Sequence, residues 1–350
     1  MKLSSLGDVV HTLPVLRTLR TAFPKAFIAW IVEEKSQDTL YKNPDLDELI
    51  VVRTKHWRRN WNLHSLREIR EVYTRLQSHR FDYVFDFQGL IKSGVFAYLS
   101  GAPNRLGFHR KDCREQLNTL FINHKAPYSG KNIHVIDKNL CLLKMVEKEG
   151  GIPDLPKEFP LAVPQEANEY IKEYLVNHPD LTGKPIVGIN PGVGFKTKQW
   201  DLKRFAELAD RISLEMGFNI LLTWGPGEED KINQITKTMS QRAWLAPPTS
   251  IHQSIALYRQ LSLFVSCDTG PLHLCAALGI PTVSIFGPTD PVRNGAYGDI
   301  HEVVCKKLPC SFCYKRRCPT QNECMDQVSV DDLFEQVKKS IATHTKVLAS

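Results

Sequence analysis

The segment LFVSCDTGPLH, residues 263–273, joins an apolar strand to a helix through a polar turn that contains glycine. Small residues continue the helix to Gly279, and a second apolar strand is predicted over 281–286. Strand, helix and strand in this order are typical of a parallel sheet with a crossover helix. Such sheets bind ligands at the carboxyl edge of their strands, which is where residues 268–270 lie.

The same alternation extends through the rest of the chain and predicts an α/β fold of two doubly wound halves. The predicted strands lie at 27–32, 49–52, 83–87, 186–190, 219–223, 261–267 and 281–286. The predicted helices lie at 12–23, 63–78, 90–99, 135–148, 201–215, 250–260 and 270–278.

A chain of 350 residues is long enough for two domains. The proline-punctuated stretch 156–164 is the predicted seam. We therefore expect an N-terminal domain over 1–160 and a second domain over 165–330. An amphipathic helix at about 331–350 is expected to pack back on the N-terminal domain.

The segment KLSSLGD, residues 2–8, is typical of a loop between a first strand and a helix. The apolar strand that should precede it is absent. Either the first sheet lacks its first strand, or the sequence as given begins a few residues late.

Composition favours a soluble protein, with 42% hydrophobic and 24% charged residues. No apolar run approaches the ~20 residues that span a bilayer, and no secretory signal is evident, so a cytoplasmic location is expected. The net charge of +7 suits an anionic partner such as a phosphorylated substrate or a lipid surface. No nucleic-acid motif is present, so nucleic acid is not expected as a partner.

Three loops carry residues suited to chemistry on a phosphorylated substrate. A helix that starts near Gly270 offers N–H groups and a dipole to an anion, and His273 lies one turn further on; the alternative is a merely well-capped helix. Lys198 lies in a glycine-containing loop that suits a diphosphate; the alternative is a solvated loop in which the lysine has no such role. Asp8 is a candidate general base or only a helix N-cap.

Four separated motifs resemble those of the lipopolysaccharide heptosyltransferases of glycosyltransferase family 9. They are KLSSLGDVVHTLP at 2–14, FDFQGLIKS at 85–93, KQW at 198–200 and SCDTGPLHLCAALGIPTVSIFGPTDPVRNGAYG at 266–298. The resemblance covers nearly the whole chain and is greatest to heptosyltransferase I.

The resemblance implies a GT-B fold, with two Rossmann-like domains and a cleft between them. It implies inverting, metal-independent transfer of heptose from ADP-L-glycero-D-manno-heptose to the Kdo region of lipopolysaccharide, with no cofactor required. The acceptor would be anionic Kdo–lipid A, met at the cytoplasmic face of the inner membrane. The alternatives are a GT-B transferase for another nucleotide sugar, a nucleotide-sugar epimerase, and a nucleotide-sugar-binding protein without catalysis. The oligomeric state is not predicted.

The resemblance also assigns roles to individual residues. Asp8 matches the catalytic base. The residues that match donor contacts are Lys198, Asp268, Thr269, Gly270, His273, and either Glu228 or Glu229 at the ribose. On the acceptor side the resemblance assigns Arg114, and from the residues themselves we also expect Ser5, Gly7, Arg58 and Arg59. Arg58 and Arg59 belong to the cationic and aromatic segment KHWRRNW at 55–61, which suits Kdo carboxylates and lipid A phosphates.

Four cysteines are spaced closely enough to hold one zinc ion or iron–sulfur centre: Cys310, Cys313, Cys318 and Cys324. Similar tails occur in members that resemble heptosyltransferase II. The prediction is that no metal is bound, with a structural metal at these thiols as the alternative.

Overall fold

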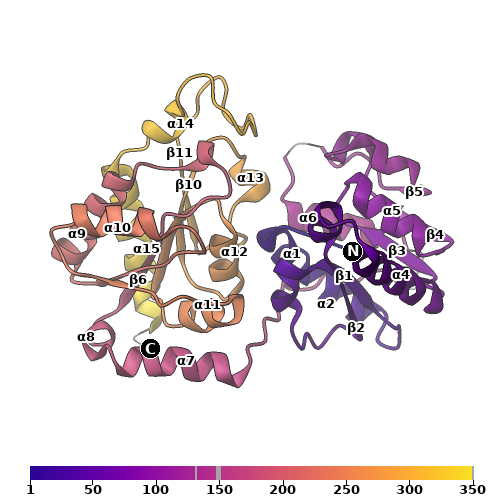
Figure 1. Cartoon of the computed structure of the whole chain (residues 1–350). Helices are drawn as coiled ribbons and strands as arrows, with labels where there is room; N and C mark the ends of the chain where they lie inside the picture. The colour runs from indigo at the N-terminus through magenta and orange to yellow at the C-terminus, as the bar shows by residue number, and fades with distance from the viewer. Residues whose placement is uncertain (131, 147–150, 349–350) are drawn as a thin grey trace. The chain divides into compact units, whose positions relative to one another are not determined.

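The computed structural model describes residues 1–130, 132–146 and 151–348. It divides the chain into two compact units, Met1–Ala162 and Val163–Ser350, each with its own parallel strands and covering helices (Figure 1). The division falls inside the proline-punctuated stretch 156–164.

Unit 2 is built on one sheet of six parallel strands in the order β11-β10-β9-β6-β7-β8. Counted from β6, this is the order 3-2-1-4-5-6 of dinucleotide-binding sheets, with the direction of winding reversing between β6 and β9. The strands are β6 (Ile186–Asn190), β7 (Asn219–Leu222), β8 (Ala243–Leu245), β9 (Leu263–Cys267), β10 (Thr282–Phe286) and β11 (His301–Cys305).

The central strands of this sheet are buried along their whole length because helices cover both faces. The helices are α7 (Gln165–Val176), α8 (Pro179–Thr182), α9 (Leu202–Met216), α10 (Glu229–Thr238), α11 (Ile251–Tyr258), α12 (Gly270–Ala277), α13 (Pro291–Asn294), α14 (Glu323–Asp326) and α15 (Val330–Leu348), with a 3-10 turn η4 (Lys196–Lys198). Helix α9 shows how the local sequence determines where a helix begins and ends. The Asp201 carboxylate accepts hydrogen bonds from the N–H groups of Lys203 and Arg204, and Gly217 closes the helix at φ 72°.

The C-terminal helix α15 packs on unit 2. Its residues Leu333, Phe334 and Val337 belong to that unit's hydrophobic core, and Arg211 of α9 pairs with Asp331 at 2.6 Å. The expectation that this helix returns to the N-terminal domain is therefore wrong. Its apolar stripe is already covered by α9 and the sheet. Residues 349–350 of the predicted helix lie outside the described residues.

Unit 1 contains two parallel sheets, β1-β2 and β3-β4-β5. The N-terminal segment Met1–Leu3 lies between them. The Leu3 carbonyl accepts from the N–H of Glu33 at 2.9 Å, and Met1 bonds through its nitrogen and its carbonyl to Phe85 and Phe87. Met1–Leu3 therefore occupies the position of the first strand that the sequence appeared to lack. Counted from this segment, the order is again 3-2-1-4-5-6.

The unit 1 strands are β1 (Ala29–Glu33), β2 (Glu48–Val52), β3 (Tyr83–Asp86), β4 (Asn104–Gly107) and β5 (His124–Lys125). Its helices are α1 (Leu6–Val10), α2 (Leu13–Ala22), α3 (Thr54–Arg59), α4 (Leu63–Ser78), α5 (Ile91–Leu99) and α6 (Val135–Leu143), with 3-10 turns η1 (Glu34–Leu40), η2 (Arg110–Asp112) and η3 (Gln116–Leu120). The predicted helix 135–148 ends earlier, at Leu143, and residues 147–148 lie outside the described part. Within the described residues no helix is both long and apolar enough to cross a membrane.

Candidate active site

The candidate donor site in unit 2 lies at the carboxyl edge of β6 and β9, where the strand order reverses. The loop after β6 carries η4 and Lys198, and the turn after β9 carries Asp268. Neighbouring parallel strands end at the same edge, so residues 70 positions apart in sequence meet here. A doubly wound sheet binds its ligands at such a switch point.

Asp268 connects the two loops. Its carboxylate lies 2.6 Å from the ammonium of Lys198 and 3.4 Å from Nε2 of His273. The Lys198 ammonium also donates to the Asp268 carbonyl and lies 4.6 Å from the centre of the Phe195 ring. Asp268 and His273 are buried, and Lys198 is nearly so. The structure therefore assembles three of the predicted donor residues into one cluster.

The charge state of Asp268 follows from its burial and from its two neighbours, Lys198 and His273. Burial alone would raise the pKa of its carboxyl. The hydrogen bond from His273 and the positive charge of Lys198 outweigh burial and lower the pKa to about 2. The carboxylate is thus ionised across the physiological range and fixes the position of the lysine ammonium.

Helix α12 begins beside this cluster. The Thr269 hydroxyl caps it by accepting from the N–H of Leu272 at 3.4 Å, and Gly270 is its first residue. The first turn of a helix leaves backbone N–H groups without intrahelical partners, and its dipole favours an anion. The predicted residues Thr269 and Gly270 therefore lie at a helix N-terminus of the kind that binds anions.

The structure distinguishes between Glu228 and Glu229, the two glutamates that are candidates for binding the ribose. The Glu228 carboxylate accepts from the N–H of Gly225 at 3.0 Å and lies against Gly192 in the loop after β6. A Cβ on Gly192 would lie only 2.6 Å from the carboxyl carbon of Glu228. Glu229, in contrast, is exposed at the start of α10. Glu228 is the acid that belongs to the switch-point edge.

In unit 1, Asp8 lies in the first turn of α1. Its Oδ2 accepts from both the N–H and the hydroxyl of Ser5 at 2.9 Å, and its Oδ1 lies 3.6 Å from the ammonium of Lys2. Ser5 is the N-cap and Asp8 its capping-box partner, so Asp8 caps the helix from the third position and not as the N-cap itself. The carboxylate is half-buried, and Gly7 beside it is buried.

The loop after β3 joins this edge. The Gln88 side chain accepts from the N–H groups of Leu3 and Ser4, and the Gly89 carbonyl accepts from the N–H of Glu115. Arg114, exposed and adjacent to Glu115, is thereby brought to the edge that carries Ser5 and Asp8.

Arg58 and Arg59 lie in α3, which follows β2, and both are exposed. The start of α3 is anchored by Glu33, whose carboxylate accepts from Thr54 and pairs with Lys92 at 2.9 Å. Lys92 belongs to the motif at 85–93, and no pattern in the sequence marks Glu33. Their pairing is a contact between the ends of β1 and α5 that sequence spacing does not reveal.

The cysteine segment returns to the donor edge of unit 2. The Lys315 carbonyl accepts from the Thr197 hydroxyl at 2.8 Å, and the N–H of Tyr314 donates to the Pro288 carbonyl. Burial raises the pKa of Tyr314, and the negative charges of Asp290 and Asp268 add to that effect. Tyr314 is a residue of this edge that the sequence analysis did not identify.

The four thiols of this segment lie near one another, because the charges of Cys318, Cys310 and Cys313 add to burial in raising the pKa of the Cys324 thiol to about 11. Across residues 1–130, 132–146 and 151–348, no three His, Cys, Asp or Glu side chains are grouped to hold a metal ion. Cys324 is buried with Met325 against Gly287, whereas Cys310 is exposed.

Comparison with known proteins agrees with these motifs and this topology. The model of "Glycosyltransferase family 9 (heptosyltransferase)" matches residues 69–323. Lipopolysaccharide heptosyltransferase 1 of Pseudomonas aeruginosa is 31% identical over 92% of this chain and 87% of its own length. Lipopolysaccharide heptosyltransferase 1 of Escherichia coli K12 is 29% identical over 87% of this chain and 92% of its own length.

Among solved structures, the E. coli heptosyltransferase WaaC with ADP superposes with a TM-score of 0.75 at 26% identity. The superposition covers 97% of this chain and 98% of the WaaC chain. The fold is accordingly GT-B-like, and the chain is a glycosyltransferase. More particularly, it belongs to glycosyltransferase family 9, the heptosyltransferase family.

Proposed function

We propose that this protein transfers heptose from ADP-L-glycero-D-manno-heptose to the Kdo region of the lipopolysaccharide inner core, with inversion and without a metal. The observation that carries the proposal is the Lys198–Asp268–His273 cluster at the switch point of unit 2. The relatives named as lipopolysaccharide heptosyltransferases support the substrate class. WaaC of E. coli has also been solved with ADP-2-deoxy-2-fluoro heptose, at 26% identity to this chain.

In the proposed reaction, an acceptor hydroxyl oxygen attacks the anomeric carbon of the heptose. The bond from that carbon to the diphosphate oxygen breaks, and ADP leaves with the bonding electrons. The hydroxyl proton passes to the Asp8 carboxylate, which acts as general base. Attack opposite the leaving group inverts the anomeric configuration.

The residues around Asp8 suit this role. The two hydrogen bonds from Ser5 fix one oxygen of the carboxylate, and the other oxygen lies 3.6 Å from the buried Lys2 ammonium. Arg58, Arg59 and Arg114 are assigned to the anionic acceptor, because a guanidinium binds carboxylates and phosphates through paired hydrogen bonds. Ser5 and Gly7 are assigned to the same side.

The donor side has to stabilise the charge that develops on the departing diphosphate. Lys198, held by Asp268, supplies a fixed cation, and the first turn of α12 supplies N–H groups. These groups take the place that a metal ion has in other glycosyltransferases. Glu228 is assigned to the ribose hydroxyls. We place the reaction at the cytoplasmic face of the inner membrane, with the protein bound peripherally.

Two measurements test this function. A panel of nucleotide sugars with Kdo2–lipid A should give transfer from ADP-heptose well above transfer from any UDP- or GDP-sugar. Asp8→Asn should lower kcat by at least about a hundredfold, the usual contribution of a general base. ADP affinity, measured by calorimetry, should stay within a few-fold of that of the unaltered protein. Preference for another donor, or full activity of Asp8→Asn, would refute the proposal.

A further inference from the structure

One short part of unit 1 carries a large excess of positive charge. Residues 53–75 contain seven arginine and lysine residues and two glutamates, a net charge of +5 out of +7 for the chain. This part comprises α3, the α3–α4 loop and most of α4. An excess of this size on one surface attracts an anionic partner.

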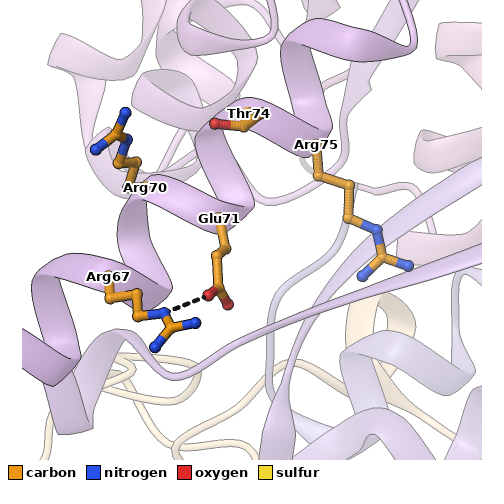
Figure 2. Close-up of a pocket in the computed structure, with 5 residues that line it drawn as sticks. All are labelled: Arg67, Arg70, Glu71, Thr74 and Arg75. Atoms are coloured by element: carbon orange, nitrogen blue, oxygen red, sulfur yellow. Dashed lines mark hydrogen bonds and ion pairs between the residues drawn. The ribbon is translucent and has the colours of Figure 1, made fainter.

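The two glutamates of this part pair with only some of its arginines. Glu68 is turned inward, where its carboxylate accepts from the Trp57 indole at 2.6 Å and pairs with Arg53. Glu71 pairs with Arg67 at 3.1 Å, as Figure 2 shows, while Arg70 lies apart from that pair. Among the described residues, none forms an ion pair with Arg58, Arg59 or Arg70.

Apolar side chains are exposed on the same surface. Helix α4 buries Ser65 and Leu76, and Ile69 and Val72 pack on the unit 1 core. Its opposite side, together with the preceding loop, exposes Trp61 (72%), Leu63 (85%), Leu66 (41%) and Tyr73 (45%). Positions 63, 66, 67, 70 and 73 follow the three-to-four residue spacing of one helix face.

We propose that Trp61, Leu63, Leu66, Arg67 and Arg70 form a membrane-docking face that binds an anionic lipid bilayer. Arginines attract the headgroups, while tryptophan and leucine side chains enter the interface between headgroups and acyl chains. A partner such as nucleic acid matches the charge but not the exposed leucines at the start of α4. The inference rests on the proposed function only in that the acceptor assigned there is carried by a membrane.

The test is sedimentation with vesicles of phosphatidylcholine alone or with 30% phosphatidylglycerol. The unaltered protein should bind the anionic vesicles more tightly, and binding should weaken as salt is raised from about 50 to 500 mM. Leu63→Ser/Leu66→Ser and Arg67→Glu/Arg70→Glu should each weaken binding by at least about tenfold. All four side chains are exposed, so the variants should keep the thermal stability of the unaltered protein.

Matched controls come from unit 2. Val176→Ser/Leu214→Ser removes apolar side chains that are 69% and 64% exposed. Lys203→Glu/Lys237→Glu reverses two exposed charges. Both controls should bind vesicles as the unaltered protein does. Full vesicle binding by the α4 variants, equal losses in the controls, or equal binding of the unaltered protein to both vesicle types would overturn the proposal.

Transfer assays separate this inference from the proposed function. The α4 variants should retain transfer to a water-soluble Kdo acceptor that lacks acyl chains, and should lose transfer to the same acceptor embedded in anionic vesicles. If the unaltered protein transfers heptose to neither acceptor, the proposed function fails while vesicle binding still decides the docking face.

Discussion

At the residue scale, Asp268 combines burial with a negative charge. Its pKa is lowered from an ordinary value of 3.8 to about 2, because His273 and Lys198 stabilise the carboxylate more than burial destabilises it. A lowered pKa means that the unfolded chain binds more protons than the folded protein between these two values. The stability that Asp268 contributes is therefore complete above about pH 4 and is lost as the pH falls toward 2.

Asp268→Asn tests this linkage. Near pH 7 the variant should be less stable than the unaltered protein by ~2.5 kcal/mol, since the pKa falls by about 1.8 units and each unit is worth about 1.4 kcal/mol. The difference should shrink as the pH is lowered from about 5 to 2.5. Urea unfolding of both proteins at each pH measures it. A difference that stays constant with pH would contradict the ionised Asp268–Lys198 pair.

Gly192 tests the position of Glu228. In Gly192→Ala the new methyl group would lie within 2.6 Å of the Glu228 carboxyl carbon, so that side chain must move. If Glu228 binds the ribose, ADP affinity should fall by about tenfold, the loss of one hydrogen bond to a charged group. Calorimetry with ADP measures the change.

Gly194→Ala is the matched control, because a Cβ on Gly194 has no atom within 4 Å. It should bind ADP as the unaltered protein does. An unchanged ADP affinity in Gly192→Ala would remove Glu228 from the ribose site.

At the element scale, α15 is part of the unit 2 core. Phe334 is buried and stacks under the Arg211 guanidinium at 4.1 Å. Phe334→Ala should destabilise the protein by about 3–5 kcal/mol, since it leaves a cavity among the side chains of α9. Glu335→Ala on the exposed side should change stability by less than about 0.5 kcal/mol. Urea unfolding compares the two, and a small effect of Phe334→Ala would contradict this packing.

The first element of unit 1 shows how a strand escapes prediction. Met1–Leu3 is too short for a periodic signal, and Lys2 interrupts its apolar residues. The Lys2 side chain is nevertheless buried, because its ammonium donates to the Phe87 carbonyl and pairs with Asp8. Only the neighbouring strands identify this segment as part of the sheet. The short strands β4, β5 and β8 were missed for a similar reason, since two to four residues carry little pattern, and the five-residue edge strand β11 was missed as well.

At the scale of the whole molecule, each unit has its own core and carries its own set of the residues assigned to the proposed reaction. All the assigned donor residues lie in unit 2, so residues 163–350 expressed alone should bind ADP within about threefold of the full chain. The separate unit should show no transfer, because Asp8 lies in unit 1. Calorimetry with ADP, with circular dichroism to verify folding, makes the comparison. A folded unit 2 that fails to bind ADP would contradict the assignment.

The sequence by itself determined the alternation of strands and helices, because apolar periodicity and glycine-containing turns are local properties. It also indicated Asp8, Lys198 and the Asp268 turn, since each lies in a short motif. Only the tertiary structure decided that Asp268 holds Lys198 and His273, that Glu228 rather than Glu229 faces the switch-point edge, and that α15 stays with unit 2. These facts depend on which strand ends become neighbours and which apolar faces meet. Contacts between residues far apart in the chain set both, and no local pattern encodes them.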